Sequence, residues 1–261
     1  MSLLEDDSKK MSWHLPGAIL LAVIVISFAI SMIIGRSEFD KVTLCEVGVK
    51  SKQSIILFDK TGGFSENQKR ILEKAIEKEI NELNVGERLA IYEIEPTIMN
   101  GLSEPVFDKC KPRDGSDADA LFENDRLMQK VFTQQFGDIV AKVTDEMISA
   151  EAAKTSPIIE SLQDIASISA LDSSVTLKRV ILISDLLQHS DALSFYRSSP
   201  SAHSPMSIQS QTPDLFGVDI QVYWLLRNSS EKNIQDSGLM SWWEHLFENA
   251  NSQGFSVMKV R

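Results

Sequence analysis

Residues 54–65, SIILFDKTGGFS, form a short apolar run that ends in a carboxylate and continues through two glycines. Residues 55–58 are strand formers and are too few for a helix. An unbroken apolar run is typical of a strand buried on both faces of a parallel sheet. Asp59 would therefore follow the carboxyl end of a strand. Ligands of open α/β sheets bind at that edge, where loops converge on helix N-termini. We expect any binding chemistry beside Asp59.

Helical and strand patterns alternate along the rest of the chain, which predicts an α/β fold with a doubly wound, mostly parallel sheet. Ser65 and Gln68 form a capping-box pattern that begins the first helix. The further expected elements are a strand at 89–94, a loop at 95–116 with a short edge strand near Val106, a long helix from Asp119 that bends near Gly137, a helix beginning at Ser156-Pro157, a strand at 179–184, a mobile surface loop at 190–213, a strand at 218–226, a helix at 241–251 and a strand at 255–260.

Charge and length limit the classes of function. The chain has 261 residues and a formal net charge of −11. Nucleic-acid binding needs a clustered basic face, and no run of Lys or Arg is present, so we exclude nucleic acid as a partner. Once a membrane segment is set aside, the remaining length corresponds to one ordinary α/β domain.

Residues 15–34 are apolar apart from Ser27 and Ser31 and carry no charge. About 20 such residues cross a bilayer core, and the run exceeds the ~7–15 residues of a cleaved signal peptide. We therefore predict an uncleaved signal-anchor: an N-terminal tail at 1–14, a transmembrane helix at 15–35, a juxtamembrane linker at 36–53 and a folded domain at 54–261. The small residues Ala18 and Ala22 would let two such helices approach closely, so we keep a homo-oligomer as an alternative.

The orientation in the membrane is not decided by charge, because Lys9 and Lys10 on one side face several basic residues on the other. Cys45 and Cys110 both follow the membrane segment. They form a disulfide if the domain is exported, or remain two reduced thiols if it is not. We favour a cytoplasmic N-terminal tail and an extracytoplasmic domain.

Three short motifs occur in an order that resembles von Willebrand factor type A domains: Asp59-x-Thr61 after a strand, Ser156-Pro157-Ile158 at a helix start, and RVILIS followed by Asp185. The resemblance covers about residues 54–261. In that family residues on three such loops bind one divalent cation, and a partner's carboxylate completes its coordination. The resemblance implies a protein-binding module, with Mg²⁺ held by oxygen ligands. The implied metal ligands are Asp59, Thr61, Ser156 and Asp185.

The motif departs from the family at Gly63, where a hydroxyl is usual, and at Ser156, where threonine is usual. A structural interpretation therefore stands beside the metal site. Ser156 before Pro157 is explained as a helix N-cap with proline at the first helical position. Asp59 can cap the turn that follows its strand.

An enzymatic resemblance is the alternative. FDKTGGFS also resembles the phosphorylation loop of haloacid-dehalogenase-like enzymes, with Asp59 as nucleophile, and Ser184 would fit their second motif. Those enzymes need a later acidic pair for Mg²⁺, whereas the last long strand runs into Arg227 and Asn228.

Other catalytic signals are absent from the sequence. The histidines are scattered without zinc-ligand spacing, and there is no nucleophile elbow or Walker loop. The Trp242-Trp243 pair is typical of helix packing. We therefore interpret the chain as a single-pass membrane protein whose domain binds a protein partner and is not an enzyme. The four histidines are His14, His189, His203 and His245.

Overall fold

The computed structural model describes residues 17, 19–27, 37–60, 62–94, 102, 104–149, 155–203, 211–227 and 230–261. The chain divides into two compact units, Met1–Phe39 and Asp40–Arg261. The second unit contains the sheet, its helices and the candidate functional site.

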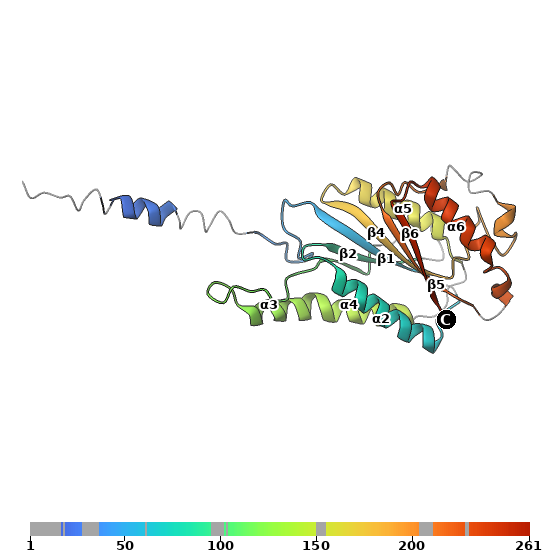
Figure 1. Ribbon diagram of the computed structural model, residues 1–261, viewed down its shortest axis with the longest axis horizontal. Coiled ribbons are helices and arrows are strands. Elements are labelled where there is room, and N and C mark those ends of the chain that lie inside the picture. The colour runs from blue at the N-terminus through green and yellow to red at the C-terminus, as the bar shows by residue number, and fades with distance from the viewer. Residues whose placement is uncertain are drawn as a thin grey trace, which may run out of the picture. The chain divides into compact units, whose positions relative to one another are not determined.

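The domain is built on a six-stranded sheet with the strand order β3-β2-β1-β4-β5-β6 (Figure 1). Only the edge strand β3 is antiparallel to its neighbour, and the other neighbouring strands pair in parallel. This confirms the predicted α/β architecture with a mostly parallel sheet. The strands are β1 (Ser51–Phe58), β2 (Arg88–Glu93), β3 (Phe107–Cys110), β4 (Val175–Ser184), β5 (Asp219–Leu225) and β6 (Gly254–Val260).

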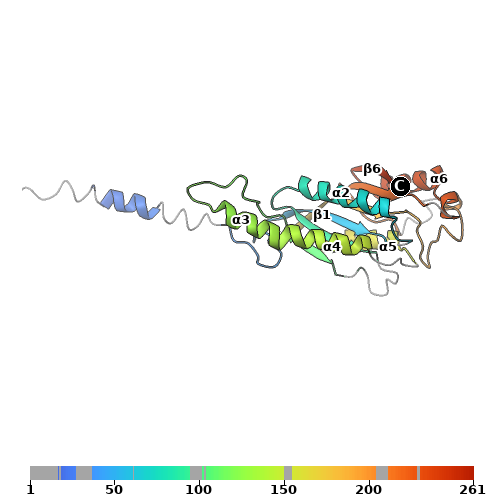
Figure 2. The same cartoon turned by 90° about the horizontal axis from the view of Figure 1, so that it is seen from below.

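Helices cover both faces of the sheet (Figures 1 and 2). On one face lie α2 (Glu66–Glu82) and α4 (Asp138–Ser149), and on the other lie α5 (Ile158–Leu171) and α6 (Ser237–Asn249). α3 (Asp125–Phe132) continues into α4 through the π-helical turn η1 (Thr133–Gly137). The 3-10 turns η2 (Pro200–Ala202) and η4 (Ser230–Asn233) lie in connections.

Two apolar cores explain the unbroken hydrophobic run of β1. Ile55 and Leu57 pack under α5 and α6, whereas Ile56 and Phe58 pack under α2 and α4. Successive strand residues point to opposite faces, so a strand covered on both sides needs apolar residues at every position. β4 repeats the pattern, and both strands are therefore central.

The start of α2 is as predicted: the Ser65 hydroxyl accepts from the Gln68 N–H, and the Gln68 side chain accepts from the Ser65 N–H. The long helix begins later than expected. Asn124 caps it, while the Asp119 carboxylate accepts N–H groups of a preceding turn, an alternative that short acidic side chains offer the backbone. The π-helical turn η1 ends at Gly137, where we expected a bend.

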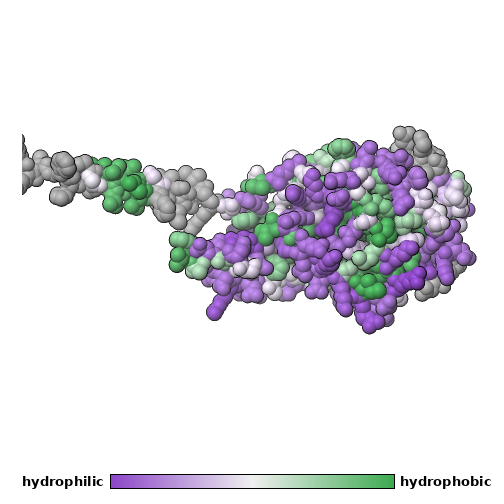
Figure 3. Space-filling view, in the orientation of Figure 1, coloured by the Kyte–Doolittle hydropathy of each residue, from purple (hydrophilic) through white to green (hydrophobic). Residues whose placement is uncertain are grey.

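The predicted transmembrane helix is not confirmed. Gly17 and residues 19–27 are helical and exposed, and residues 19–26 are hydrophobic, as the green surface in Figure 3 shows. The rest of the predicted span lies outside the described residues. Within the part of the chain that the structure describes, no helix is long and apolar enough to cross a membrane.

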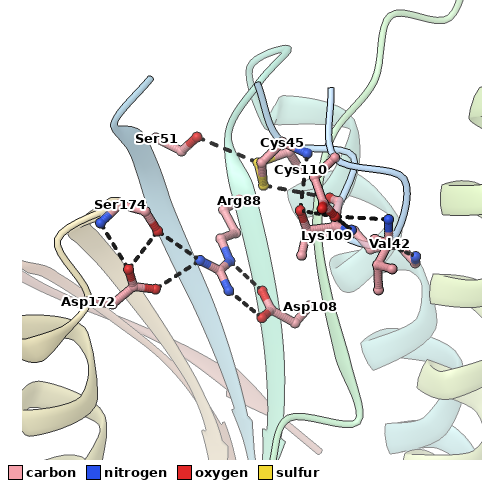
Figure 4. The surroundings of a disulfide bond; sticks show 11 residues. Val42, Cys45, Ser51, Arg88, Asp108, Lys109, Cys110, Asp172 and Ser174 are labelled. Atoms are coloured by element: carbon pink, nitrogen blue, oxygen red, sulfur yellow. Dashed lines mark hydrogen bonds and ion pairs between the residues drawn. A yellow bond between two sulfur atoms is a disulfide. The ribbon is translucent and has the colours of Figure 1, made fainter. Parts of the chain in front are cut away.

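Cys45 and Cys110 are joined by a disulfide, with Cα atoms 4.9 Å apart (Figure 4). The Cys110 N–H donates to the Thr43 carbonyl over 2.7 Å. Residues 40–50, which we expected to be linker, are thereby tied to the edge strand β3. The compact unit starts at Asp40 and β1 at Ser51, so the folded region begins earlier than the predicted residue 54.

The expected mobile loop at 190–213 is packed in its described part. Leu193 and Phe195 are buried, and the Phe195 ring meets the Trp242 ring edge-on at 5.0 Å. Residues 204–210 lie outside the described residues. The sequence pattern missed this packing because the apolar residues of the segment follow no helix or strand period.

Candidate functional site at the carboxyl edge of the sheet

Asp59 and Asp185 follow the carboxyl ends of β1 and β4, which are neighbouring parallel strands at the centre of the sheet. From β1 the chain proceeds to β2 on one side, and from β4 to β5 on the other. Ligands of open α/β sheets bind at such a reversal, because the loops diverge there and leave a crevice. Each aspartate is only 1% exposed.

Two hydroxyl groups converge on the Asp59 carboxylate. Its Oδ2 accepts from Ser156 Oγ over 2.8 Å and from Ser184 Oγ over 2.6 Å. Ser156 stands just before α5, and Ser184 is the last residue of β4. Asp59, Ser156 and Asp185, which the sequence analysis singled out together, therefore lie at one edge of the sheet. The structure does not describe Thr61.

The Asp185 carboxylate pairs with Arg227, which the sequence analysis did not include in the site. Asp185 Oδ2 accepts from Arg227 Nε over 2.9 Å, and Oδ1 accepts from the Leu187 N–H over 2.9 Å. Arg227 Nη1 also donates to the Gly63 carbonyl. The arginine therefore joins the ends of β4 and β5 to the glycine loop after β1. The sequence signal that could have identified Arg227 is its position, because it is a charged residue two positions after the buried strand β5.

The turn after Asp185 is held by the core beneath it. Leu186 has a left-handed φ of 65°, a conformation that costs energy for a residue with a branched side chain. Its N–H donates to Ser184 Oγ, and its carbonyl accepts from Trp243 Nε1 over 2.9 Å. The Asp185 carbonyl accepts from Trp224 Nε1 over 3.2 Å. The two indoles thus fix the backbone that presents Asp185.

Burial and charge set the electrostatics of the site. Burial, followed by the negative charge of Asp59, raises the pKa of Asp185 to about 6, and Arg227 opposes this shift. Tyr196 lies nearby at 42% exposure. Burial raises its pKa most, and the charges of Asp185 and Glu231 raise it further. Tyr196 is therefore an exposed group that experiences the charge of the buried cluster.

Ser156 does not cap α5, so that structural prediction is wrong. The Ile159 N–H at the helix start instead donates to Gln188 Oε1 over 3.0 Å. Ser156 and His189 exchange backbone hydrogen bonds of 2.9 and 2.8 Å, which turns the Ser156 side chain towards Asp59. Gln188, which lies 29 positions after Ile159, therefore caps the helix, and the Ser156 hydroxyl is available to Asp59.

A hard divalent cation such as Mg²⁺ needs several oxygen ligands. Asp185 is engaged by a guanidinium, and Asp59 accepts two hydroxyl protons. Gly63 supplies a backbone carbonyl to Arg227 and no side-chain oxygen. Over the described residues no group of three or more His, Cys, Asp or Glu side chains is placed to hold a metal ion. The described residues therefore do not fit a resident Mg²⁺ while Arg227 holds this position.

No protein-family model matches the sequence, and no curated protein matches it. One similar solved structure is a von Willebrand factor type A protein from Catenulispora acidiphila, with 12% identity, a TM-score of 0.44, and 83% of this chain matched to 40% of that chain. This chain thus spans less than half of that protein.

Two further structures cover 81% of this chain and 92% of their own, each with 11% identity. They are an aerotolerance-related membrane protein from Bacteroides fragilis carrying multiple mutations to serines, with a TM-score of 0.38, and the conserved hypothetical protein BatB from Bacteroides thetaiotaomicron, with a TM-score of 0.40.

Proposed function

We propose that this protein is a membrane-anchored binding module that recruits a protein partner through the carboxyl edge of a von Willebrand factor A-like domain. The observation that carries the proposal is the convergence of Asp59, Ser156 and Asp185 at the reversal point of the sheet. Burying polar groups costs free energy unless they are hydrogen-bonded. A hydrogen-bonded cluster such as this one holds the surrounding loops in a defined arrangement.

The groups that a partner would touch surround this cluster. Tyr196 is partly exposed, Gly62 is exposed at the glycine loop, and Lys60 forms an ion pair with Glu93 at the ends of β1 and β2. A half-exposed tyrosine is a good anchor for a protein interface, because it provides a large contact area and a hydroxyl group.

The enzymatic alternative fits less well. A phosphoryl-transfer nucleophile must reach its substrate, whereas Asp59 is 1% exposed and its Oδ2 accepts two buried hydroxyl groups. Full-length protein incubated with Mg²⁺ and a generic phosphatase substrate or ATP should show no turnover. Turnover that disappears in Asp59→Asn would favour the phosphoryl-transfer enzyme instead.

For the anchor we propose the apolar segment at residues 15–34. The Cys45–Cys110 disulfide supports an extracytoplasmic domain, because disulfides persist in oxidising compartments. Full-length protein should stay in the membrane fraction after alkaline extraction, and a chain lacking residues 1–36 should be released. A shortened chain that stays with the membrane would contradict this anchor.

The binding edge is tested by site-specific crosslinking in the full chain. A photoreactive residue at Tyr196 should yield a defined adduct with one protein partner. The matched control is Val85, which is exposed in the loop before β2 and therefore lies at the opposite edge of the sheet. The same adduct from both positions, or from Val85 alone, would contradict binding through the Asp59 edge.

A further inference from the structure

We infer that Arg227 is the built-in cation of this edge, so that the site is assembled and balanced without a divalent metal ion. The inference concerns the edge in the proposed function, but it rests on contacts within the chain and requires no partner. It assigns to Arg227 the position that the resemblance would give to Mg²⁺.

The first step is the charge that the fold has buried. Asp59 and Asp185 are each 1% exposed and lie at the ends of adjacent strands. Two buried carboxylates repel each other, and each loses hydration, so a positive charge or a proton must compensate them. The Arg227–Asp185 ion pair supplies a positive charge inside the cluster.

The second step is that Arg227 is held in place rather than simply lying nearby. Its side chain is 10% exposed, and its backbone N–H donates to Gln235 Oε1 over 2.7 Å. Gln235 Nε2 in turn donates to the Asp185 carbonyl over 2.9 Å and to the Leu225 carbonyl over 2.8 Å. One glutamine therefore fixes the backbone on both sides of the ion pair.

The third step is the shape of the glycine loop. Gly62 has φ +75°, and a Cβ added there would lie 3.0 Å from Arg227 Cζ. The Gly63 carbonyl accepts from Arg227 Nη1. Glycine thus permits both the left-handed turn and the close approach of the guanidinium. The loop matches the planar fork of arginine, whereas a metal site would use side-chain oxygens from this loop.

These contacts relate one departure from the family motif to the arginine that the sequence analysis missed. The chain has Gly63 where a ligand hydroxyl would be expected, and it has Arg227 two residues after the end of β5. Each would be unfavourable alone, because the loop would lack an oxygen ligand and the arginine would lack a partner. In combination the Gly63 carbonyl accepts from Arg227 Nη1, and the same guanidinium pairs with Asp185, which lies 42 positions earlier in the chain.

The experiment measures thermal unfolding of the purified full-length protein in Mg²⁺, in Mn²⁺ and in EDTA at constant ionic strength. The variants are Arg227→Gln, which removes the charge, and Arg227→Lys, which keeps it. The matched control is Arg179→Gln, because Arg179 forms a 2.8 Å ion pair with the buried Glu79 away from this edge.

We expect the wild-type melting temperature to be the same in all three solutions. Arg227→Gln should melt several degrees lower and recover part of that loss in Mg²⁺ or Mn²⁺, because two buried carboxylates are then left without their cation. The melting temperature of Arg227→Lys should fall by less than that of Arg227→Gln, and it should not change when Mg²⁺ or Mn²⁺ is added. Arg179→Gln should melt lower with no metal response.

A wild-type melting temperature that rises in Mg²⁺, or falls in EDTA, would overturn the inference. So would an Arg227→Gln protein that melts like the wild type, or one that loses stability and gains none from either metal. If Arg227→Gln does not fold, the wild-type measurement and Mn²⁺ binding followed by electron paramagnetic resonance decide the question. Bound Mn²⁺ in the wild type that Asp185→Asn abolishes would refute the inference. None of these outcomes depends on a protein partner.

Discussion

The Ser156 hydroxyl donates to the Asp59 carboxylate over 2.8 Å, although 97 residues separate the two in sequence. The bond joins the approach to α5 to the end of β1, across the point where the sheet reverses direction. Ser184 adds a second donor to the same oxygen over 2.6 Å. The edge of the sheet is therefore held by polar contacts between segments that are remote in the chain.

Ser156→Ala should lower the unfolding free energy by about 1.5–3 kcal/mol, because hydrogen bonds to ionised groups are stronger than neutral ones. Urea titration measures this. The control is Ser161→Ala, whose buried hydroxyl donates to the neutral Pro157 carbonyl in the first turn of the same helix. That change should cost about 0.5–1.5 kcal/mol. A larger loss for Ser161→Ala than for Ser156→Ala would contradict the assignment.

Gln188→Ala should destabilise the protein by about 0.5–2 kcal/mol, the usual cost of losing a helix cap, because the buried Ile159 N–H then has no side-chain acceptor. The comparison is Gln129→Ala on the exposed surface of α3, which should change stability by less than about 0.5 kcal/mol. Equal losses for the two variants would show that Gln188 has no capping role.

Arg227→Met should cost about 3–5 kcal/mol, because it leaves the buried Asp185 carboxylate without its cation. Asp185→Asn should also destabilise, since Arg227 then remains buried with a neutral partner. The double variant should lose less than the sum of the two, with a coupling of about 0.5–3 kcal/mol in a double-mutant cycle. Additive losses would mean that the two side chains do not interact.

The raised pKa of Asp185 predicts that the stability of the protein depends on pH. Its folded pKa of about 6 is higher than the unfolded value near 3.9, so between these values the native state binds more protons. This contribution to stability is fully present below about pH 4 and is lost as the pH rises through 6.

Asp185→Asn should remove that slope, so the stability difference between wild type and variant should change between about pH 4 and 6. The difference isolates Asp185 from carboxylates such as Asp172, whose pKa is lowered by the Ser174 hydroxyl and which therefore acts at lower pH. A difference that is constant over the whole window would contradict the raised pKa.

The disulfide should contribute about 2–5 kcal/mol, because it links residues 65 positions apart and so restricts the unfolded chain. Replacing both Cys45 and Cys110 with alanine should lower the urea midpoint accordingly. Thiol labelling of native protein under non-reducing conditions should find no free cysteine. Quantitative labelling of both would refute the bond. Ser51→Ala is the local control, because its hydroxyl lies 3.5 Å from Cys110 Sγ without being part of the bond.

Much of the fold could be predicted because its patterns are local. The runs at residues 55–58 and 180–183 are apolar at every position, a pattern that a strand covered on both faces requires. The Ser65–Gln68 capping box needs no information beyond four residues. The order of these elements also placed Asp59 and Asp185 at the same edge, because parallel strands share their carboxyl ends.

The site could be predicted only in part. Its acidic residues follow strands and were found, but Arg227 was missed, since no local pattern distinguishes a basic residue that returns to the core from one that faces water. The interpretation of Ser156 as a helix cap, which stood beside its place in the site, was wrong for a similar reason. Its sequence context satisfies the capping rule, and only the packing of residue 188 against α5 takes that role away from it.

The sequence by itself determined the strand and helix periods, the cap of α2, and the positions of the two aspartates at strand ends, because each depends on residues within a few positions. Tertiary structure alone decided that Cys45 meets Cys110 and that Arg227 meets Asp185. Those pairings depend on the strand order β1-β4-β5 and on the path of residues 40–50 beside β3. Contacts between distant segments form only when the whole sheet has assembled, and so the charge balance of this site is a property of the fold.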